Sequence, residues 1–341
     1  MPVFMRFIAQ LALLSGLLLL LGCSPSTPQP IKHQILVFGT EVNLSLFPEN
    51  PQQVQEAQLA IKAIEAEFYQ FHQDWHAWDK GGILSKINQA IAAQQPIEVA
   101  DSVKNFVLKS QTLAKESGYL FDPGIGSLIK LWGFHGENWQ GPPPSKSALQ
   151  DWLAQHPSIA DVSFVGNQLQ CRNPKVSLDF GGNAKGLALD LAINTLKQNG
   201  IQNAIVDIGG DMRIIGSKHG QPFHIGIQNP QAPEQAIASL DLQGDESVVT
   251  SGTYQRFFEW QGQRFSHILD PRTAQPASVF ASVTVIHPDA TRADAAATAL
   301  MIAGKDWQTV ALNMGISQVF IIDTQGNFFF TPQMRQRIKL L

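Results

Sequence analysis

The sequence predicts an α+β protein in which mixed, largely antiparallel sheets are packed against helices. Strand-like segments outnumber helical segments, and the two kinds are mixed along the chain. A regular alternation of strand and helix would predict a parallel sheet, and the sequence does not have this alternation. The 341 residues, 44% of them hydrophobic and 15% charged, are sufficient to bury a substantial core. We therefore expect one compact folded unit.

Helices are expected where apolar residues recur every three or four positions. These segments are residues 54–71, 102–117, 185–198 and 293–303. Strands are expected where β-branched and aromatic residues gather between turn signals. These segments are residues 35–47, 204–208, 212–215, 223–227, 256–265, 283–286 and 318–322. The first of these segments is a strand or a strand pair, interrupted at Gly39 and Thr40, and Gly209 with Gly210 predicts a hairpin between the second and the third segments.

Residues 1–22 have the pattern of a signal peptide. One positive charge precedes an uncharged, Leu-rich run at residues 7–21, which is shorter than the ~20 residues of a membrane-spanning helix. Gly22 stands directly before Cys23, and Leu20 stands three positions before that cysteine. This arrangement resembles the bacterial lipobox, whose cysteine is acylated and becomes the new N-terminus after cleavage.

The pattern predicts a lipoprotein signal peptide over residues 1–22, a lipid-anchored leash over residues 23–34 and one folded domain over residues 35–341. Because several acyl chains anchor a protein stably, acylated Cys23 would hold the domain on a membrane. The domain would then face the periplasm or another extracytoplasmic side. The alternative is an ordinary secretory signal in which Cys23 is incidental.

Charge and cysteine content argue against several classes of function. With a formal net charge of −4 and no basic block in the sequence, a surface that binds nucleic acid by neutralising phosphates is not expected. Cys23 and Cys171 are the only cysteines, so acylation of Cys23 leaves Cys171 without a disulfide partner. The sequence has no CxxC or HExxH pattern, and zinc or dithiol chemistry therefore has no local support.

Asp294 and Thr298 are polar residues on an otherwise apolar predicted helix. Their spacing of four positions places both oxygens on one face of that helix. A carboxylate and a hydroxyl are hard ligands that suit Mg²⁺. The alternative is a capping box with Thr291 as the N-cap and Asp294 at N3, which needs no metal. Spacing alone favours capping.

Two further segments contain polar groups that could bind an anion or act as an acid or base. Residues 178–186 run from a strand through a Gly-rich turn into a helix, where backbone amides and Lys185 can face an anion. Close packing is the simpler explanation of that turn. His267 and Asp270 lie three positions apart and suit acid–base chemistry, although a histidine bonded to the backbone and an Asx turn at Asp270 explain them equally. The sequence has no GxSxG elbow that would support a hydrolase triad.

A series of segments in one order carries a resemblance to a known family. They are residues 38–40, Trp78 with residues 84–88, and residues 116–134, 178–190, 207–211, 250–254, 267–271 and 293–298. Together they span roughly residues 35–325 and resemble the FAD:protein FMN transferases, or ApbE-type flavin transferases. The second half is the more similar. Residues 181–190 match the family signature Gly-Gly-x-Ala-Lys-Gly-x-Ala-x-Asp, and residues 293–298 match Ala-Asp-Ala-x-Ala-Thr.

The resemblance implies that the chain forms an ApbE or T-fold-like single catalytic unit. The implied reaction is Mg²⁺-dependent transfer of FMN from FAD, the substrate, to a Thr or Ser side chain of a target protein, with release of AMP. The implied target is a respiratory redox subunit. The implied metal ligands are Asp294, Thr298 and the carbonyl of Ala184. The residues implied to line the FAD site are Phe38, Thr40, Trp78, Leu120, Phe121, Asp122, Lys185 and His267, and those implied to be catalytic are His267 and Asp294.

The sequence departs from the family pattern at several positions. Phe38 replaces a Met, Trp78 and Leu187 stand where Tyr is common, and Ala274 stands where Gly is common. Most of these changes concern contacts with the flavin, and none removes the implied metal carboxylate. Two alternatives to transfer stay open. One is a pyrophosphatase that hydrolyses FAD to FMN and AMP, and the other is a non-catalytic FAD-binding lipoprotein.

Overall fold

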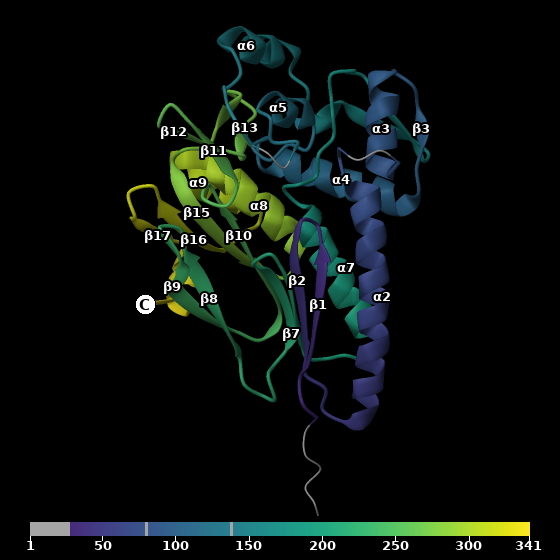
Figure 1. Ribbon diagram of the computed structural model, residues 1–341, viewed down its shortest axis with the longest axis vertical. Coiled ribbons are helices and arrows are strands. Elements are labelled where there is room, and N and C mark those ends of the chain that lie inside the picture. Colours follow the sequence, from purple (N-terminus) through teal and green to yellow (C-terminus); the bar gives the residue numbers. More distant parts are fainter. Residues whose placement is uncertain (1–27, 79–80, 137–138) are drawn as a thin grey trace, which may run out of the picture.

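The computed structural model describes residues 28–78, 81–136 and 139–341 (Figure 1). The predicted signal peptide, Cys23 and the first part of the leash lie outside the described residues. Within the described part of the chain, no helix is both long enough and apolar enough to cross a membrane.

One eight-stranded sheet organises the molecule (Figure 1). In spatial order its strands are β1 (Ile31–Val37), β2 (Thr40–Leu46), β6 (Ala204–Ile208), β7 (Asp211–Gly216), β10 (Gly244–Gly252), β15 (Phe280–His287), β16 (Gln318–Asp323) and β17 (Phe328–Phe330). Every neighbouring pair in this sheet is antiparallel. The predicted α+β class with antiparallel pairing is therefore confirmed.

Smaller sheets and ribbons surround the main sheet. They are a sheet of β18 (Lys339–Leu340), β9 (Ala232–Leu242) and β8 (Phe223–Asn229), a sheet of β3 (Ile97–Glu98), β5 (Gln168–Cys171) and β4 (Val162–Val165), and the two ribbons β11 (Phe257–Trp260) with β12 (Gln263–Ser266) and β13 (Leu269–Asp270) with β14 (Gln275–Pro276). The segment predicted as one strand over residues 256–265 is the β11–β12 hairpin, since Gln261 and Gly262 turn the chain with φ of 50° and 78°.

In Figure 1 some helices lie alongside the main sheet, and others lie above it together with the short strands. They are α2 (Pro51–Trp75), α3 (Ile83–Ala92), α4 (Asp101–Glu116), α5 (Gly126–Leu131), α6 (Lys146–Gln155), α7 (Ala184–Gln198), α8 (Ala290–Ala303), α9 (Trp307–Asn313) and α10 (Pro332–Arg337), with short 3₁₀ turns η1 (Ile159–Asp161) and η2 (Gly304–Asp306). Helix α8 packs on β10 and β15, α7 packs on α8, and α2 packs on α7.

All four predicted helices are present, and each begins one to three residues earlier than predicted. Caps explain the two largest differences. The side chain of Asn50 accepts a hydrogen bond from Gln53 N and so starts α2, and Asp289 starts α8 by accepting one from Arg292 N. The long strand β9 was not predicted because its first half is exposed and polar, and it therefore has no alternating pattern.

Helix α8 lies at the centre of the largest apolar cluster, and its contact with α7 is unusually close. Ala293, Ala295, Ala296, Ala297 and Ala299 are all fully buried. A Cβ atom placed on Gly186 of α7 would lie 2.3 Å from the carbonyl oxygen of Ala290, the first residue of α8. Only glycine permits this approach of the two backbones.

We therefore expect Gly186→Ala to destabilise the protein by about 1–3 kcal/mol, because the added methyl group forces α7 and α8 apart. Urea unfolding measures the change. Gly226→Ala on β8 is the matched control, since its Cβ would meet nothing closer than Ala236 Cβ at 3.4 Å. Equal stability of the Gly186 and Gly226 variants would contradict the close packing described above.

Candidate functional site

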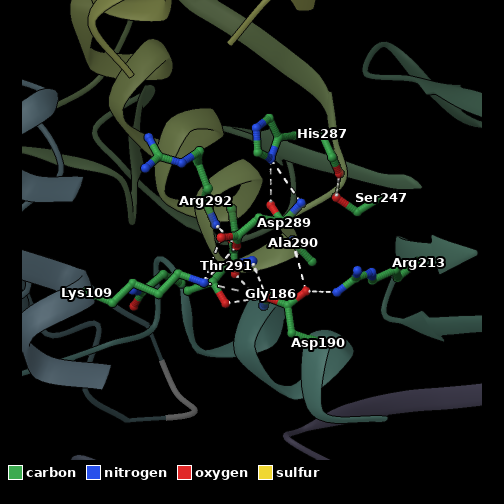
Figure 2. A network of polar contacts seen from close by, with 12 residues as sticks. Lys109, Gly186, Asp190, Arg213, Ser247, His287, Asp289, Ala290, Thr291 and Arg292 are labelled. Carbon is green, nitrogen blue, oxygen red and sulfur yellow. Dashed lines mark hydrogen bonds and ion pairs between the residues drawn. The ribbon is translucent and has the colours of Figure 1, made fainter. Parts of the chain in front are cut away.

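The first turn of α8 is held by two carboxylates (Figure 2). Asp289 is the N-cap, and its Oδ1 accepts a hydrogen bond from Arg292 N at 2.9 Å. The capping box predicted from spacing, with Thr291 as N-cap and Asp294 at N3, is therefore wrong. Asp294 lies more than one turn inside the helix, where it is available for another role.

The second carboxylate comes from α7. Asp190 accepts hydrogen bonds from Ala290 N at 3.0 Å, Thr291 N at 3.0 Å and Thr291 Oγ1 at 2.6 Å. It also forms an ion pair with Arg213 of β7. Figure 2 shows Asp190 between Arg213 and the start of α8. Asp190 therefore ties α8 to α7 and to the main sheet.

Asp294 is a buried carboxylate at the α7–α8 contact. Its side chain is 3% exposed, and its Oδ2 accepts a hydrogen bond from Gly186 N at 2.9 Å. Among the described residues, no hydrogen bond reaches its Oδ1. Burial raises the pKa of Asp294 to about 7, which the positive charge of Lys185 opposes. A cation at the carboxylate would favour the ionised form, so this group fits a metal ligand.

The Gly-rich turn lies over Thr298, one turn further along α8. A Cβ atom on Gly182 would lie 3.3 Å from Thr298 Oγ1 and 3.2 Å from the ring of Phe121. Ala184 begins α7 directly after this turn. The structure thus brings the three predicted metal ligands, Asp294, Thr298 and Ala184, to one end of the α7–α8 contact.

This oxygen set fits Mg²⁺, which takes one or two carboxylates and keeps several waters. In the part of the chain that the structure describes, no cluster of three or more His, Cys, Asp or Glu side chains could hold a metal. The candidate site contains a single carboxylate together with a hydroxyl and a carbonyl. It therefore suits a hard cation that shares its coordination with a bound anion, and it lacks the nitrogen and sulfur ligands that zinc prefers.

Lys185 provides a fixed positive charge beside Asp294. It forms an ion pair with Asp211, which is 2% exposed and accepts a hydrogen bond from Thr250 N at 2.9 Å. Burial disfavours the ammonium ion, but the carboxylates of Asp211 and Asp294 outweigh that effect and raise the pKa of Lys185. Lys185 therefore stays charged at neutral pH and can face an anion.

Phe38 lies in the turn between β1 and β2, and Thr40 is the first residue of β2. Phe38 has φ of 61°, and the centre of its half-buried ring lies 5.3 Å from that of Phe68 and 5.7 Å from that of Phe71, both on α2. Thr40 touches the β6–β7 turn, where a Cβ atom on Gly209 would lie 2.8 Å from its Oγ1. That turn leads directly into Asp211, so Thr40 lies near the Lys185 pair.

His267 follows β12 and is anchored by the backbone. Its N and Nδ1 atoms lie 3.1 Å and 3.0 Å from the carbonyl oxygen of Arg256. Because a carbonyl only accepts hydrogen bonds, Nδ1 carries the proton and Nε2 carries a lone pair. Burial, together with the nearby charge of Arg256, lowers the pKa of His267 to about 4. His267 is therefore neutral at pH 7.

Asp270 forms the Asx turn expected from its position before Pro271. Its Oδ1 accepts a hydrogen bond from Arg272 N at 2.9 Å.

Trp78 is held by the carboxylate of Asp179, which was not predicted as a site residue. The side chain of Trp78 hydrogen-bonds Asp179, and its ring centre lies 5.5 Å from that of His135. Asp179 Oδ1 also accepts from Gly181 N at 2.8 Å, which ties Trp78 to the Gly-rich turn. Burial raises the pKa of Asp179.

The Leu120–Asp122 segment is buried beneath the turn. Asp122 Oδ1 accepts hydrogen bonds from Gly124 N at 2.7 Å and Ile159 N at 2.8 Å. These bonds give Asp122 a structural role in holding its own loop. The ring of Phe121 packs against Gly182 in the Gly-rich turn. Contacts of Leu120 and Asp122 with FAD stay predictions.

Three charged residues near the site were missed as functional residues. They are Asp179, Asp211 and Arg256. Asp179 and Asp211 lie inside segments that carry the family resemblance, so those segments were the signal that could have found them. Arg256 had no comparable signal. It stands before a strand, and only the fold brings its charge near His267, Lys185 and Asp179.

The chain is similar in sequence to a known family and to several of its members. The model of the ApbE family matches residues 38–320. An FAD:protein FMN transferase of Rhodobacter capsulatus is 38% identical over 332 residues, and the match covers 96% of this chain and 62% of that protein. One of Treponema pallidum is 30% identical over 302 residues, with 84% and 83% covered. The chain therefore spans less than two thirds of the Rhodobacter relative.

Two solved structures are similar in fold to this chain. The apbe protein of Thermotoga maritima has a TM-score of 0.81 at 32% identity, and the match covers 91% of this chain and 99% of that chain. Flavin Transferase ApbE from Vibrio cholerae has a TM-score of 0.78 at 25% identity, with the same shares covered.

We expect the imidazole of His267 to titrate near pH 4 in an NMR pH series. Between pH 6.5 and 4 the unfolded chain binds a proton at this residue more readily than the folded chain does, so its contribution to stability is lost as the pH falls through that window. Urea unfolding at pH 7 and pH 4.5 should therefore show a larger loss for the wild type than for His267→Gln. A titration midpoint near 6.5 would argue against a desolvated ring.

Proposed function

The chain belongs to the ApbE family, and on this premise we propose that it is an enzyme, an FAD:protein FMN transferase. It would move the FMN part of FAD to the hydroxyl of a Thr or Ser residue in a target protein and release AMP. The observation that carries the proposal is the position of Asp294 beside Gly186 N, Lys185 and the Gly-rich turn.

Asp294, Thr298 and the carbonyl of Ala184 would hold Mg²⁺. When bound, Mg²⁺ stabilises the negative charge that develops on the diphosphate oxygens. The hydrogen bond from Gly186 N orients the Asp294 carboxylate through one of its oxygens. This leaves Oδ1 for the cation and supports a preorganised ligand.

Lys185 would bind the diphosphate of FAD, because Asp211 holds its ammonium group in place. His267 would accept the proton of the target hydroxyl at Nε2, since Nδ1 is engaged by the carbonyl of Arg256. The hydroxyl oxygen then forms a bond to the FMN phosphorus. The bond from that phosphorus to the bridging oxygen breaks, and AMP leaves with that oxygen.

The remaining predicted residues would bind the rest of FAD. Trp78, fixed through Asp179, offers a flat ring for stacking, and Phe38 is supported from behind by α2. Thr40 and Phe121 touch the two Gly-containing turns beside the metal ligands. Leu120 and Asp122 would contribute through the buried loop that carries Phe121.

We also propose that acylated Cys23 anchors the protein on the extracytoplasmic side of a membrane. The apolar run at residues 7–21 followed by Gly22 and Cys23 supports this. A respiratory redox subunit with an exposed Thr or Ser segment on the same side of the membrane would be a suitable target.

Asp294→Asn should reduce FMN transfer by about 100-fold or more, because it removes the anionic metal ligand. The assay incubates the protein with FAD, Mg²⁺ and a candidate respiratory subunit, and then records in-gel flavin fluorescence and AMP. Asp241→Asn on β9, an exposed carboxylate of a different sheet, is the control and should retain full activity.

A fluorescent target accompanied by an equal amount of AMP supports transfer. Free FMN and AMP produced without any target identify a pyrophosphatase instead. Retention of FAD without AMP identifies a binding protein and contradicts the proposal. Full activity of Asp294→Asn would refute the metal role.

Cys23→Ser should move the protein from the membrane fraction to the soluble fraction of its host. Cell fractionation followed by immunoblotting measures the distribution. Since the substitution leaves residues 35–341 unchanged, FMN transfer by the released protein should persist. Membrane association that survives the substitution would argue against acylation as the anchor.

A further inference from the structure

We propose that Asp190 is a positioning residue for the cation site, because its carboxylate fixes the register of α8 on α7 and so sets the affinity of Asp294 and Thr298 for a divalent cation. The inference rests on the proposed function, since it concerns the metal that this function requires. Asp190 itself is engaged by α8 and Arg213 and contributes no ligand.

The contacts that α8 makes with α7 and with the turn before α7 form a regular series. Asp190 bonds Ala290, Gly186 bonds Asp294, and the space beside Gly182 is bounded by Thr298. Successive contacts are four residues apart on each side, and the numbers run in opposite directions. We call this series the α7–α8 seam. The first two contacts lie one helical turn apart on the same face of the antiparallel pair α7–α8, and the third continues the series into the turn before Ala184, the first residue of α7.

Because of the α7–α8 seam, the positions of the predicted metal ligands depend on the contact between Asp190 and Ala290. Two of the three contacts carry predicted ligands, Asp294 and Thr298, and the third is Asp190 with Ala290. Because a helix moves as a rigid element, a shift of α8 by one residue is about 1.5 Å along its axis. A shift of that size would break the bond from Gly186 N to Asp294 Oδ2. It would also move Thr298 away from the turn before Ala184.

Asp190 is suited to prevent such a shift. It accepts two backbone N–H groups of the first turn of α8, which have no partner within that helix, and it meets the positive end of the helix dipole. Arg213, 8% exposed, holds Asp190 from β7 and is itself held by Asp245 at 2.9 Å. Lys109 of α4 lies 3.8 Å away. The carboxylate is thus fixed from three elements.

Asp289 offers a matched control. It caps the same helix through Arg292 N at 2.9 Å and pairs with Lys109 at 2.8 Å, so its loss also weakens the start of α8. Asp289 precedes α8 directly, however, and makes no bond to α7. A purely stabilising role for Asp190 predicts that variants at positions 190 and 289 behave alike. A positioning role predicts that they differ.

The experiment titrates Mn²⁺ into the FAD-bound full-length mature protein and follows the EPR signal of the free ion, with thermal unfolding recorded in parallel. Asp190→Asn should weaken Mn²⁺ binding by about 10-fold or more, as expected for residues that orient metal ligands. Thr291→Val, which loses the 2.6 Å bond to Asp190, should weaken it about 3-fold, and Thr291→Ser should restore it. Asp289→Asn should lower the melting temperature and leave the affinity within about 2-fold of wild type.

The Thr291 pair keeps the test decisive if Asp190→Asn fails to fold. Wild-type Mn²⁺ affinity in folded Asp190→Asn or Thr291→Val overturns the inference, as does an equal loss in Asp289→Asn. These results leave the proposed function standing as long as Asp294→Asn abolishes binding. No Mn²⁺ binding by the wild type, or unchanged binding by Asp294→Asn, overturns the metal role in the proposed function and the inference together.

Discussion

The close contact between α7 and α8 at Gly186 is the constraint on which the site depends. Since a Cβ atom there would lie 2.3 Å from Ala290 O, the two helices meet backbone to backbone. That approach lets Gly186 N reach Asp294 Oδ2 and places the Gly-rich turn over Thr298. The apolar cluster around the Ala-rich α8 supports the contact from the other side. The geometry of the candidate metal ligands therefore follows from packing.

The site contains buried groups of opposite charge, and each favours the ionised form of the other. Lys185 lies between the carboxylates of Asp211 and Asp294, which keep it charged, while burial of Asp294 disfavours its ionised form. His267 stays neutral beside Arg256. Groups with such perturbed pKa values gather at functional sites. A cation and a diphosphate would complete the balance of charge.

The sequence was sufficient for the parts of the fold that repeat a local pattern. Helices α2, α4, α7 and α8, the β6–β7 hairpin and the segments with the Gly-rich turn, His267 and Asp294 were predicted, and a strand pair was one of two alternatives for residues 35–47. The capping assignment failed because spacing cannot show that Asp289 already caps α8. Asp190 lies in the segment that matches the family signature, but its partners could not be predicted, and neither could those of Arg256, since these partners lie on other elements and only tertiary packing brings them together. Strand β9 lacked the alternation that a half-buried strand shows.

The most direct test of the account is a crystal structure of the protein with FAD and Mn²⁺, with the metal located by its anomalous scattering. The account predicts one strong peak within bonding distance of the Asp294 carboxylate, Thr298 Oγ1 and the Ala184 carbonyl, with the diphosphate as a further ligand. A peak bound elsewhere, or a diphosphate far from α8 with no metal beside it, would contradict it.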